Sequence, residues 1–171
     1  LMVPTKSSIR MCLDSGATGL IFSTIENAKQ CEKIMNCCKY PKFGGRRGLG
    51  LVRANKWGLS TLITDPPIVI AQIETISAIN NLEDILKYNF DHYMIGPYDL
   101  SASLGVPGDF TSALYLDAIK KMEDMIPKNK MAVHIPTEVK KYLKKYEDYG
   151  IMALGMDTTG LLEFYTELED K

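Results

Sequence analysis

Two carboxylates follow short apolar runs at points where a parallel sheet would place its chemistry. Glu74 comes directly after the run at residues 68–73, and Asp99 comes shortly after the run at residues 93–95. In barrel enzymes the active site lies at the C-terminal ends of the strands. Two oxygen ligands from neighbouring strands, with room for water and substrate, suit a hard divalent ion such as Mg²⁺ or Mn²⁺. The pattern therefore predicts a metal site at Glu74 and Asp99.

Each carboxylate also has a purely structural interpretation. Glu74 could be an acid at a helix N-terminus, where the helix dipole favours negative charge. Asp99 could be the N-cap of a short helix at residues 100–104. The preceding Gly96-Pro97 pair predicts a tight turn that would aim the Asp99 side chain at a pocket. Residue type and spacing leave these alternatives open.

A glycine-rich cationic loop at residues 44–50 contains Arg46 and Arg47. Such a loop could guide an anionic substrate or close over a pocket. The alternative is a turn whose arginines are solvated. Of the two histidines, His134 ends an apolar run and could face the pocket as a base, or simply pack at a strand end. His92 precedes a run, at the end opposite the expected active site, and is interpreted as structural.

The elements that would position these residues alternate between strand and helix. Residues 68–73 form the clearest strand, a run rich in branched side chains after Pro66-Pro67. The predicted strands are residues 1–3, 18–22, 68–73, 93–95, 131–135 and 151–156. The predicted helices are residues 6–15, 26–38, 75–88, 100–104, 112–125, 137–149 and 160–168, with a loop at 41–50 and a helical turn at 53–57. Thr75 and Thr137 are the expected N-caps of the helices that they begin.

Alternating strands and helices predict a parallel sheet covered by helices. A doubly wound sheet and a (β/α)₈ TIM barrel both fit the pattern. A barrel usually needs eight units and about 250 residues, whereas the sequence offers six units in 171 residues. We therefore expect residues 1–171 to form one partial barrel domain that lacks its first two βα units.

Composition sets limits on the functional class. The net charge is −1 and the pI is about 6.2, so a nucleic-acid or anionic-membrane partner is not expected. No apolar run approaches the roughly 20 residues that span a bilayer, and no leader pattern opens the chain. The four cysteines, Cys12, Cys31, Cys37 and Cys38, form no C-x-x-C pair and are interpreted as reduced thiols. We expect a cytoplasmic protein.

Five motifs together resemble one enzyme family. They are LDSGA at 13–17, GRRGLG at 45–50 followed by RANKW at 53–57, QIET at 72–75, GPYDLS at 96–101, and GMDTT at 155–159. In this order and at this spacing they are similar to the class II pyruvate-dependent aldolases of the 4-hydroxy-2-oxo-heptane-1,7-dioate aldolase type, within the phosphoenolpyruvate/pyruvate superfamily. The resemblance covers essentially the whole chain.

The resemblance implies roles for particular residues. Glu74 and Asp99 match the two metal-binding carboxylates, and Gln72 matches an amide that contacts the substrate. The backbone of Tyr98 matches the position that binds the pyruvate carboxylate. Asp14 matches an acid that reaches the site of a neighbouring subunit and raises the basicity of the catalytic histidine; its structural alternative is a solvated acid near a helix end. The family match also places Arg47 near the site as a substrate-binding residue.

Two expected groups do not occur in this chain. The catalytic histidine of the family belongs to an earlier strand, and the arginine that polarises the substrate carbonyl would fall near residues 1–4, which contain none. We therefore expect an intact metal half of the site, and a proton-transfer half that is altered or lies outside this sequence.

The implied reaction is metal-dependent cleavage of a 4-hydroxy-2-oxo acid to pyruvate and an aldehyde, or the reverse condensation. Mg²⁺ or Mn²⁺ is the expected cofactor, with Co²⁺ or Zn²⁺ as alternatives. By resemblance, the expected assembly is a homo-oligomer, specifically a hexamer. Two other functions stay open: an acyl-CoA lyase of the same superfamily, and a catalytically impaired barrel that binds a 2-oxo acid or serves as an assembly subunit.

Overall fold

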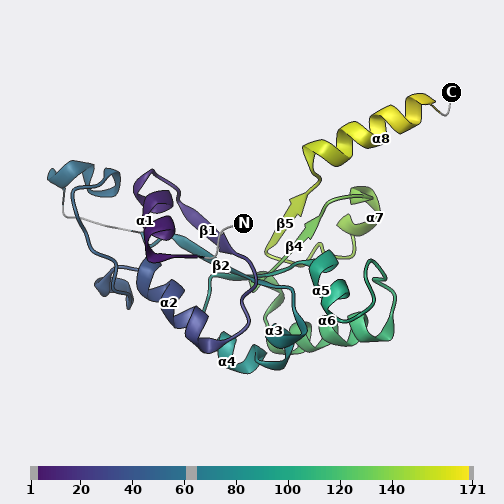
Figure 1. The fold of residues 1–171 in the computed structure, drawn as a ribbon, viewed down its shortest axis with the longest axis horizontal. Helices are drawn as coiled ribbons and strands as arrows, with labels where there is room; N and C mark the ends of the chain where they lie inside the picture. The colour runs from purple at the N-terminus through teal and green to yellow at the C-terminus, as the bar shows by residue number, and fades with distance from the viewer. Residues whose placement is uncertain (1–3, 61–64, 170–171) are drawn as a thin grey trace. The chain divides into compact units, whose positions relative to one another are not determined.

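Helices and parallel strands alternate along the chain, as the sequence predicts (Figure 1). The computed structural model describes residues 4–60 and 65–169. It divides into two compact units, Leu1–Asp91 and His92–Lys171. The predicted strand at residues 1–3 lies outside the described residues. The α/β class is therefore confirmed, and each unit is described by itself.

The first unit is built on a pair of parallel strands, β1 (Gly19–Phe22) and β2 (Ile68–Ile73). Their register runs from Gly19 opposite Ile68 to Phe22 opposite Ala71. A Cβ atom at Gly19 would lie 2.9 Å from the Ile68 carbonyl oxygen, so glycine permits this close approach. Four consecutive β2 residues, Val69–Gln72, include three that are buried. This burial explains why β2 is a continuous apolar run.

Two capped helices pack together in this unit. Thr5 caps α1 (Lys6–Asp14) by accepting a hydrogen bond from the Ser8 amide at 3.0 Å. Asn27 caps α2 (Ala28–Cys38) in the same way through Gln30, also at 3.0 Å. Each helix buries one face at helical spacing: Ile9 and Leu13 from α1, and Cys31, Ile34, Met35 and Cys38 from α2.

The region after β2 differs from the prediction of one helix at 75–88. Two short helices occur instead, α3 (Ile76–Asn80) and α4 (Leu82–Leu86). They meet at Asn81, whose side-chain amide donates to the Glu26 carbonyl at 2.9 Å. Thr75 caps α3 as predicted, since its hydroxyl accepts from the Ala78 amide at 3.1 Å. The predicted loop at 41–50 contains a 3₁₀ turn, η1 (Pro41–Phe43), and a second, η2 (Arg53–Gly58), replaces the helical turn expected at 53–57.

The second unit contains three parallel strands with β4 in the middle. They are β3 (His92–Ile95), β4 (Met131–Ile135) and β5 (Ile151–Leu154). Tyr93 pairs with Met131, and Ala132 pairs with Ile151. All three lie close to their predicted positions, and helical segments connect them, as parallel strands require.

The helices of the second unit show three corrections. They are α5 (Pro97–Ser103), α6 (Ala113–Met125), α7 (Val139–Leu143) and α8 (Asp157–Glu169), with a 3₁₀ turn η3 (Lys128–Lys130). The helix expected at 100–104 begins earlier, because Pro97 fits the first helical position. The helix expected at 160–168 also begins earlier, at Asp157. The helix expected at 137–149 is reduced to α7, and its N-cap is Glu138 in the left-handed conformation rather than Thr137.

Two further expectations concern cysteines and membranes. All four cysteines are free thiols, as predicted. Burial raises the pKa of the Cys31 thiol to about 11 and that of the Cys38 thiol to about 12. Among the helices that the structure describes, none has the length and apolarity needed to cross a bilayer.

The two threonines that the sequence offered as caps give a matched test. Thr75→Ala removes a hydrogen bond to an otherwise unpaired helix amide and should lower the free energy of unfolding by about 1 kcal/mol. Thr137→Ala should change it by less than about 0.5 kcal/mol, because this residue is not a cap. Urea denaturation of both variants measures the difference. Equal losses would show that the helix start at Ile76 is misplaced.

Candidate functional site

Glu74 is a buried carboxylate at the end of β2. It is only 4% exposed. Its Oε1 accepts two hydrogen bonds from Thr24, one from the backbone amide at 2.6 Å and one from the hydroxyl at 3.0 Å. Thr75 caps α3 and Ile76 begins it, so Glu74 lies before the cap and outside the helix. Glu74 therefore lies next to the N-terminus of α3 but outside the helix itself.

Gln72 lies two residues before Glu74 along the same extended segment. Residues two apart on a strand project to the same side. Gln72 is half-buried, whereas its neighbours Ala71 and Ile73 are fully buried. The backbone carbonyl of Gln72 accepts from the Ile25 amide at 3.4 Å. One side of the end of β2 therefore carries an amide and a carboxylate.

Asp99 belongs to the second unit and lies in the first turn of α5. Gly96 is the N-cap of this helix and Pro97 is its first residue, so the N-cap interpretation of Asp99 is wrong. The side chain of Asp99 is exposed. An acid in the first helical turn is favoured by the unpaired amides there. The structure thus places this carboxylate in the helix that follows the C-terminal end of β3.

Tyr98, the residue before Asp99, is held through both its backbone carbonyl and its ring. Its carbonyl accepts a hydrogen bond from the buried Ser101 hydroxyl at 2.8 Å, and that hydroxyl accepts from the Gly108 amide at 2.9 Å. The Tyr98 ring meets the Phe110 ring edge to face, with 5.1 Å between centroids. The backbone at Tyr98 is therefore held firmly, while half of the residue's surface stays exposed.

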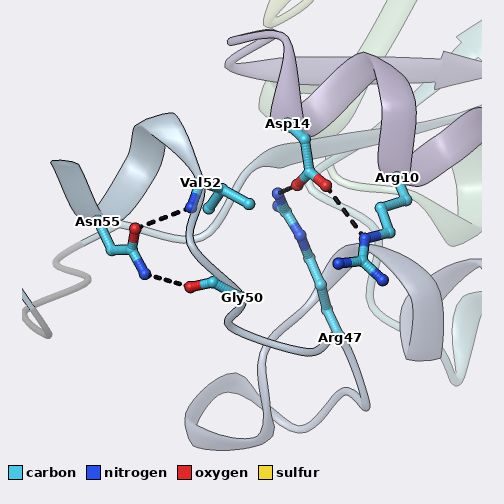
Figure 2. A network of polar contacts seen from close by, with 6 residues as sticks. All are labelled: Arg10, Asp14, Arg47, Gly50, Val52 and Asn55. Atoms are coloured by element: carbon cyan, nitrogen blue, oxygen red, sulfur yellow. Dashed lines mark hydrogen bonds and ion pairs between the residues drawn. The ribbon is translucent and has the colours of Figure 1, made fainter. Parts of the chain in front are cut away.

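Asp14 and Arg47 form an ion pair inside the first unit (Figure 2). Arg47 Nη2 donates to Asp14 Oδ1 at 2.7 Å, and Arg10 Nε donates to Asp14 Oδ2 at 3.1 Å. The Arg47 side chain is 6% exposed, and its guanidinium carbon lies 4.7 Å from the centre of the Tyr40 ring. Neither Arg47 nor Asp14 is simply solvated, because each is held in this ion pair. Arg46, the other arginine of this loop, is exposed.

Asn55 holds the segment that follows this loop, and the sequence analysis did not single it out. It is 2% exposed. Its Oδ1 accepts from the Val52 amide at 3.0 Å, and its Nδ2 donates to the Gly50 carbonyl at 2.6 Å (Figure 2). Lys56 and Trp57, directly after it, both adopt left-handed backbone conformations. Buried asparagine at a turn is a recognisable signal, but one sequence does not reveal which asparagine is buried.

Both histidines lie on strands of the second unit. His134 is half-buried in β4, and its Nε2 lies 3.3 Å from the Gly155 carbonyl oxygen. It also borders a cavity of about 60 Å³ whose lining includes Tyr98, Phe110, Tyr115, Tyr142 and Tyr146. His92 is the first residue of β3, and its buried Nδ1 has no hydrogen-bond partner among the described residues.

The donor set of the predicted metal site is small. Across residues 4–60 and 65–169, no group of three or more His, Cys, Asp or Glu side chains lies together as a metal cluster. Glu74 and Asp99 belong to separate units, so the structure describes each one alone. Both are oxygen donors that follow strand ends, which is the donor chemistry that Mg²⁺ and Mn²⁺ prefer, with water completing the shell.

The ion pair at Asp14 predicts unequal effects of its two arginines. Arg47→Met should lower the free energy of unfolding by about 2 kcal/mol, because it leaves a half-buried carboxylate without its stronger partner. Arg10→Met is the matched control, and loss of its exposed pair should cost less than about 1 kcal/mol. Thermal and urea denaturation measure both. A larger loss in the Arg10 variant would contradict the geometry.

Comparison with known proteins places the chain in a family. Residues 3–163 match the family described as HpcH/HpaI aldolase/citrate lyase. The chain is 33% identical over 157 residues to a 4-hydroxy-2-oxovalerate aldolase of Rhodococcus jostii, an alignment that covers 88% of this chain and 60% of that protein. It is 36% identical over 109 residues to a 2-keto-3-deoxy-L-rhamnonate aldolase of Escherichia coli, with 60% of this chain and 41% of that protein covered.

A solved structure agrees in fold. A family protein from Burkholderia cenocepacia superposes with a TM-score of 0.80 at 22% identity, over 97% of this chain and 69% of that one. The alignments with the two curated aldolases cover 60% and 41% of the lengths of those proteins, so the chain spans only part of each. The resemblance inferred from the motifs is confirmed at the level of the family: the chain belongs to the HpcH/HpaI aldolase/citrate lyase family.

Proposed function

We propose that this chain forms the metal-binding part of an enzyme that cleaves a 4-hydroxy-2-oxo acid to pyruvate and an aldehyde, or joins them. One observation carries the proposal. A buried carboxylate, Glu74, stands at the end of a parallel strand in a chain of an aldolase family, and two Thr24 hydrogen bonds keep it in place. Burial of a charged carboxylate is costly in free energy. A cation bound at this strand end would offset that cost.

Glu74 and Asp99 are the proposed ligands of a divalent cation, Mg²⁺ or Mn²⁺, with Co²⁺ or Zn²⁺ as alternatives. Their carboxylate oxygens fit the preference of these ions, and each follows a strand end in its own unit. When bound, the cation would supply electrostatic stabilisation for negative charge that develops on the pyruvate portion of the substrate.

The other residues of the proposal bind and orient the substrate. The Gln72 amide, beside Glu74 at the end of β2, would donate to the 2-oxo acid. The Tyr98 amide lies in the first turn of α5, where helix amides lack partners within the helix, so it can receive the substrate carboxylate. Asp99 would contact the substrate as well as the cation. Holding the substrate in one orientation before bond cleavage is itself a large part of catalysis.

Asp14 completes the proposal as an acid that tunes proton transfer. Its two carboxylate oxygens are already paired with Arg47 and Arg10, and a quarter of its side chain stays exposed. A carboxylate can accept further hydrogen bonds beyond one at each oxygen. The resemblance implies that Arg47 binds the substrate, but its guanidinium is buried against Asp14, so in this scheme Arg47 acts on the site through Asp14 instead. The base that removes the substrate hydroxyl proton is not among the residues assigned here.

A larger assembly is part of the same proposal. We infer that the chain forms part of an eight-stranded barrel in a cytoplasmic homo-oligomer, with a hexamer as the expected state. Exposed apolar side chains on α8 support association, because a contiguous apolar surface favours burial against another chain. These side chains are Leu161, Leu162, Phe164, Tyr165 and Leu168. The proposed partners are otherwise small molecules, a 2-oxo acid and an aldehyde.

The two proposed ligands predict a shared phenotype. Glu74→Gln and Asp99→Asn should each lower Mn²⁺-dependent pyruvate release from a 4-hydroxy-2-oxo acid by at least about 100-fold, because an amide replaces an anionic ligand. Continuous coupling of pyruvate to NADH oxidation by lactate dehydrogenase gives the rate.

Matched controls are available on the surface of the same chain. Glu83→Gln and Asp117→Asn replace exposed acids on α4 and α6. Both should leave the rate within about twofold. Circular dichroism should show all four variants folded. Retention of wild-type turnover by either ligand variant would refute the assignment.

A further inference from the structure

Thr24 adopts a backbone conformation that is unfavourable for its residue type. It follows the end of β1 and has a φ of 54°, in the left-handed region. The other non-glycine residues with positive φ among the described residues are Lys56, Trp57, Asn89 and Glu138, and none of them has a branched Cβ. A β-branched residue in this region is a genuine outlier. Such strain persists only where surrounding contacts impose it, and it concentrates at functional sites.

The strained conformation directs two donors of Thr24 at one atom. The backbone amide and the hydroxyl both reach Oε1 of Glu74, at 2.6 Å and 3.0 Å. Glycine would adopt this φ without strain and could keep the amide bond. Only the hydroxyl bond requires a side chain at this position. The Thr24 side chain causes the backbone strain, and it adds one hydrogen bond, from its hydroxyl to the buried Glu74 carboxylate.

Contacts on the other side of Thr24 prevent it from relaxing. The Thr24 carbonyl accepts from Gln30 Nε2 at 3.2 Å, while Gln30 Oε1 accepts from the Glu26 amide at 2.8 Å. The next amide, that of Ile25, donates to the Gln72 carbonyl. Thr24 is thus held between the first turn of α2 and the end of β2, and it transmits that rigidity to Glu74.

We propose that Thr24 is a positioning residue that fixes the orientation of the Glu74 carboxylate for binding a divalent cation. This inference rests on the proposed function, because it requires Glu74 to be a ligand. Partners that hydrogen-bond to metal ligands set the orientation of those ligands, and their loss typically weakens metal affinity about 10- to 100-fold. Thr24 contacts neither cation nor substrate in this scheme and acts only through Glu74.

Direct Mn²⁺ binding, measured by electron paramagnetic resonance of the free ion, tests this without relying on turnover. Thr24→Val keeps the branched Cβ and removes the hydroxyl, and Thr24→Gly also removes the strain. Both should raise the Mn²⁺ dissociation constant about 10-fold or more. Thr24→Ser keeps the hydroxyl and should stay within about threefold of wild type. Thr24→Gly should melt within about 4 °C of wild type, since relief of strain offsets the lost bond.

Asn89→Gly is the control for placing glycine at another left-handed position of the same unit. Asn89 is exposed, belongs to the same unit and has a φ of 48°, and its replacement should leave the Mn²⁺ dissociation constant unchanged. Wild-type affinity in both Thr24→Val and Thr24→Gly, alongside loss of binding in Glu74→Gln, would overturn the role of Thr24 and leave the metal site standing. Mn²⁺ binding that is unaffected by Glu74→Gln would overturn the proposed function and this inference together.

Discussion

Burial of the Glu74 carboxylate is the constraint on which the candidate site depends. Removing a charged carboxylate from water is expensive unless donors replace the lost hydration. In the first unit these donors come from Thr24, which the parallel pairing of β1 and β2 brings beside the end of β2. The position of Glu74 therefore depends on three features together: the register of β1 and β2, the turn at Thr24 and the first turn of α2. These features hold a single carboxylate at the end of a strand.

A second carboxylate in the same unit, that of Asp14, is held by an ion pair. Asp14 ends α1 and is gripped by Arg47, which is itself enclosed beside Tyr40. The Arg47 backbone amide donates to the Lys39 carbonyl at 3.0 Å, which anchors the loop to the end of α2. Helix α2 thus supports both anions: its first turn constrains Thr24, and its last turn constrains Arg47. Within the cationic loop at residues 44–50, Arg47 holds the Asp14 carboxylate in place.

The sequence was informative where one local signal dominated. The run at 68–73 was correctly bounded, because branched apolar residues after two prolines leave few alternatives to a buried strand. Thr75 was correctly predicted as a cap. The helix at 75–88 was wrongly continuous, since only the contact from Asn81 to the Glu26 carbonyl shows why the chain breaks there. Thr137 was wrongly predicted as a cap, because nothing local indicates the left-handed backbone at Glu138.

The candidate site shows the same division. Strand-end position and motif spacing were enough to select Gln72, Glu74 and Asp99, and the structure confirms that each lies at or just after the end of its strand. Thr24 was missed, although it also follows a strand end, because backbone strain leaves no trace in residue type. The burial of Arg47 was missed for a similar reason: its partners Asp14 and Tyr40 are brought together only by the packing of α1 against α2. Interactions between distant segments are what a single sequence conceals.

We propose that Glu74 and Asp99 share one divalent cation. A crystal structure of the native protein with Mn²⁺ and pyruvate, with data collected at the manganese absorption edge, tests it most directly. If the two residues share a cation, the map will show one anomalous peak with an oxygen of each carboxylate within about 2.3 Å, the range for a hard divalent ion with oxygen ligands. A peak bound elsewhere, or one that involves only one of these carboxylates, would contradict it.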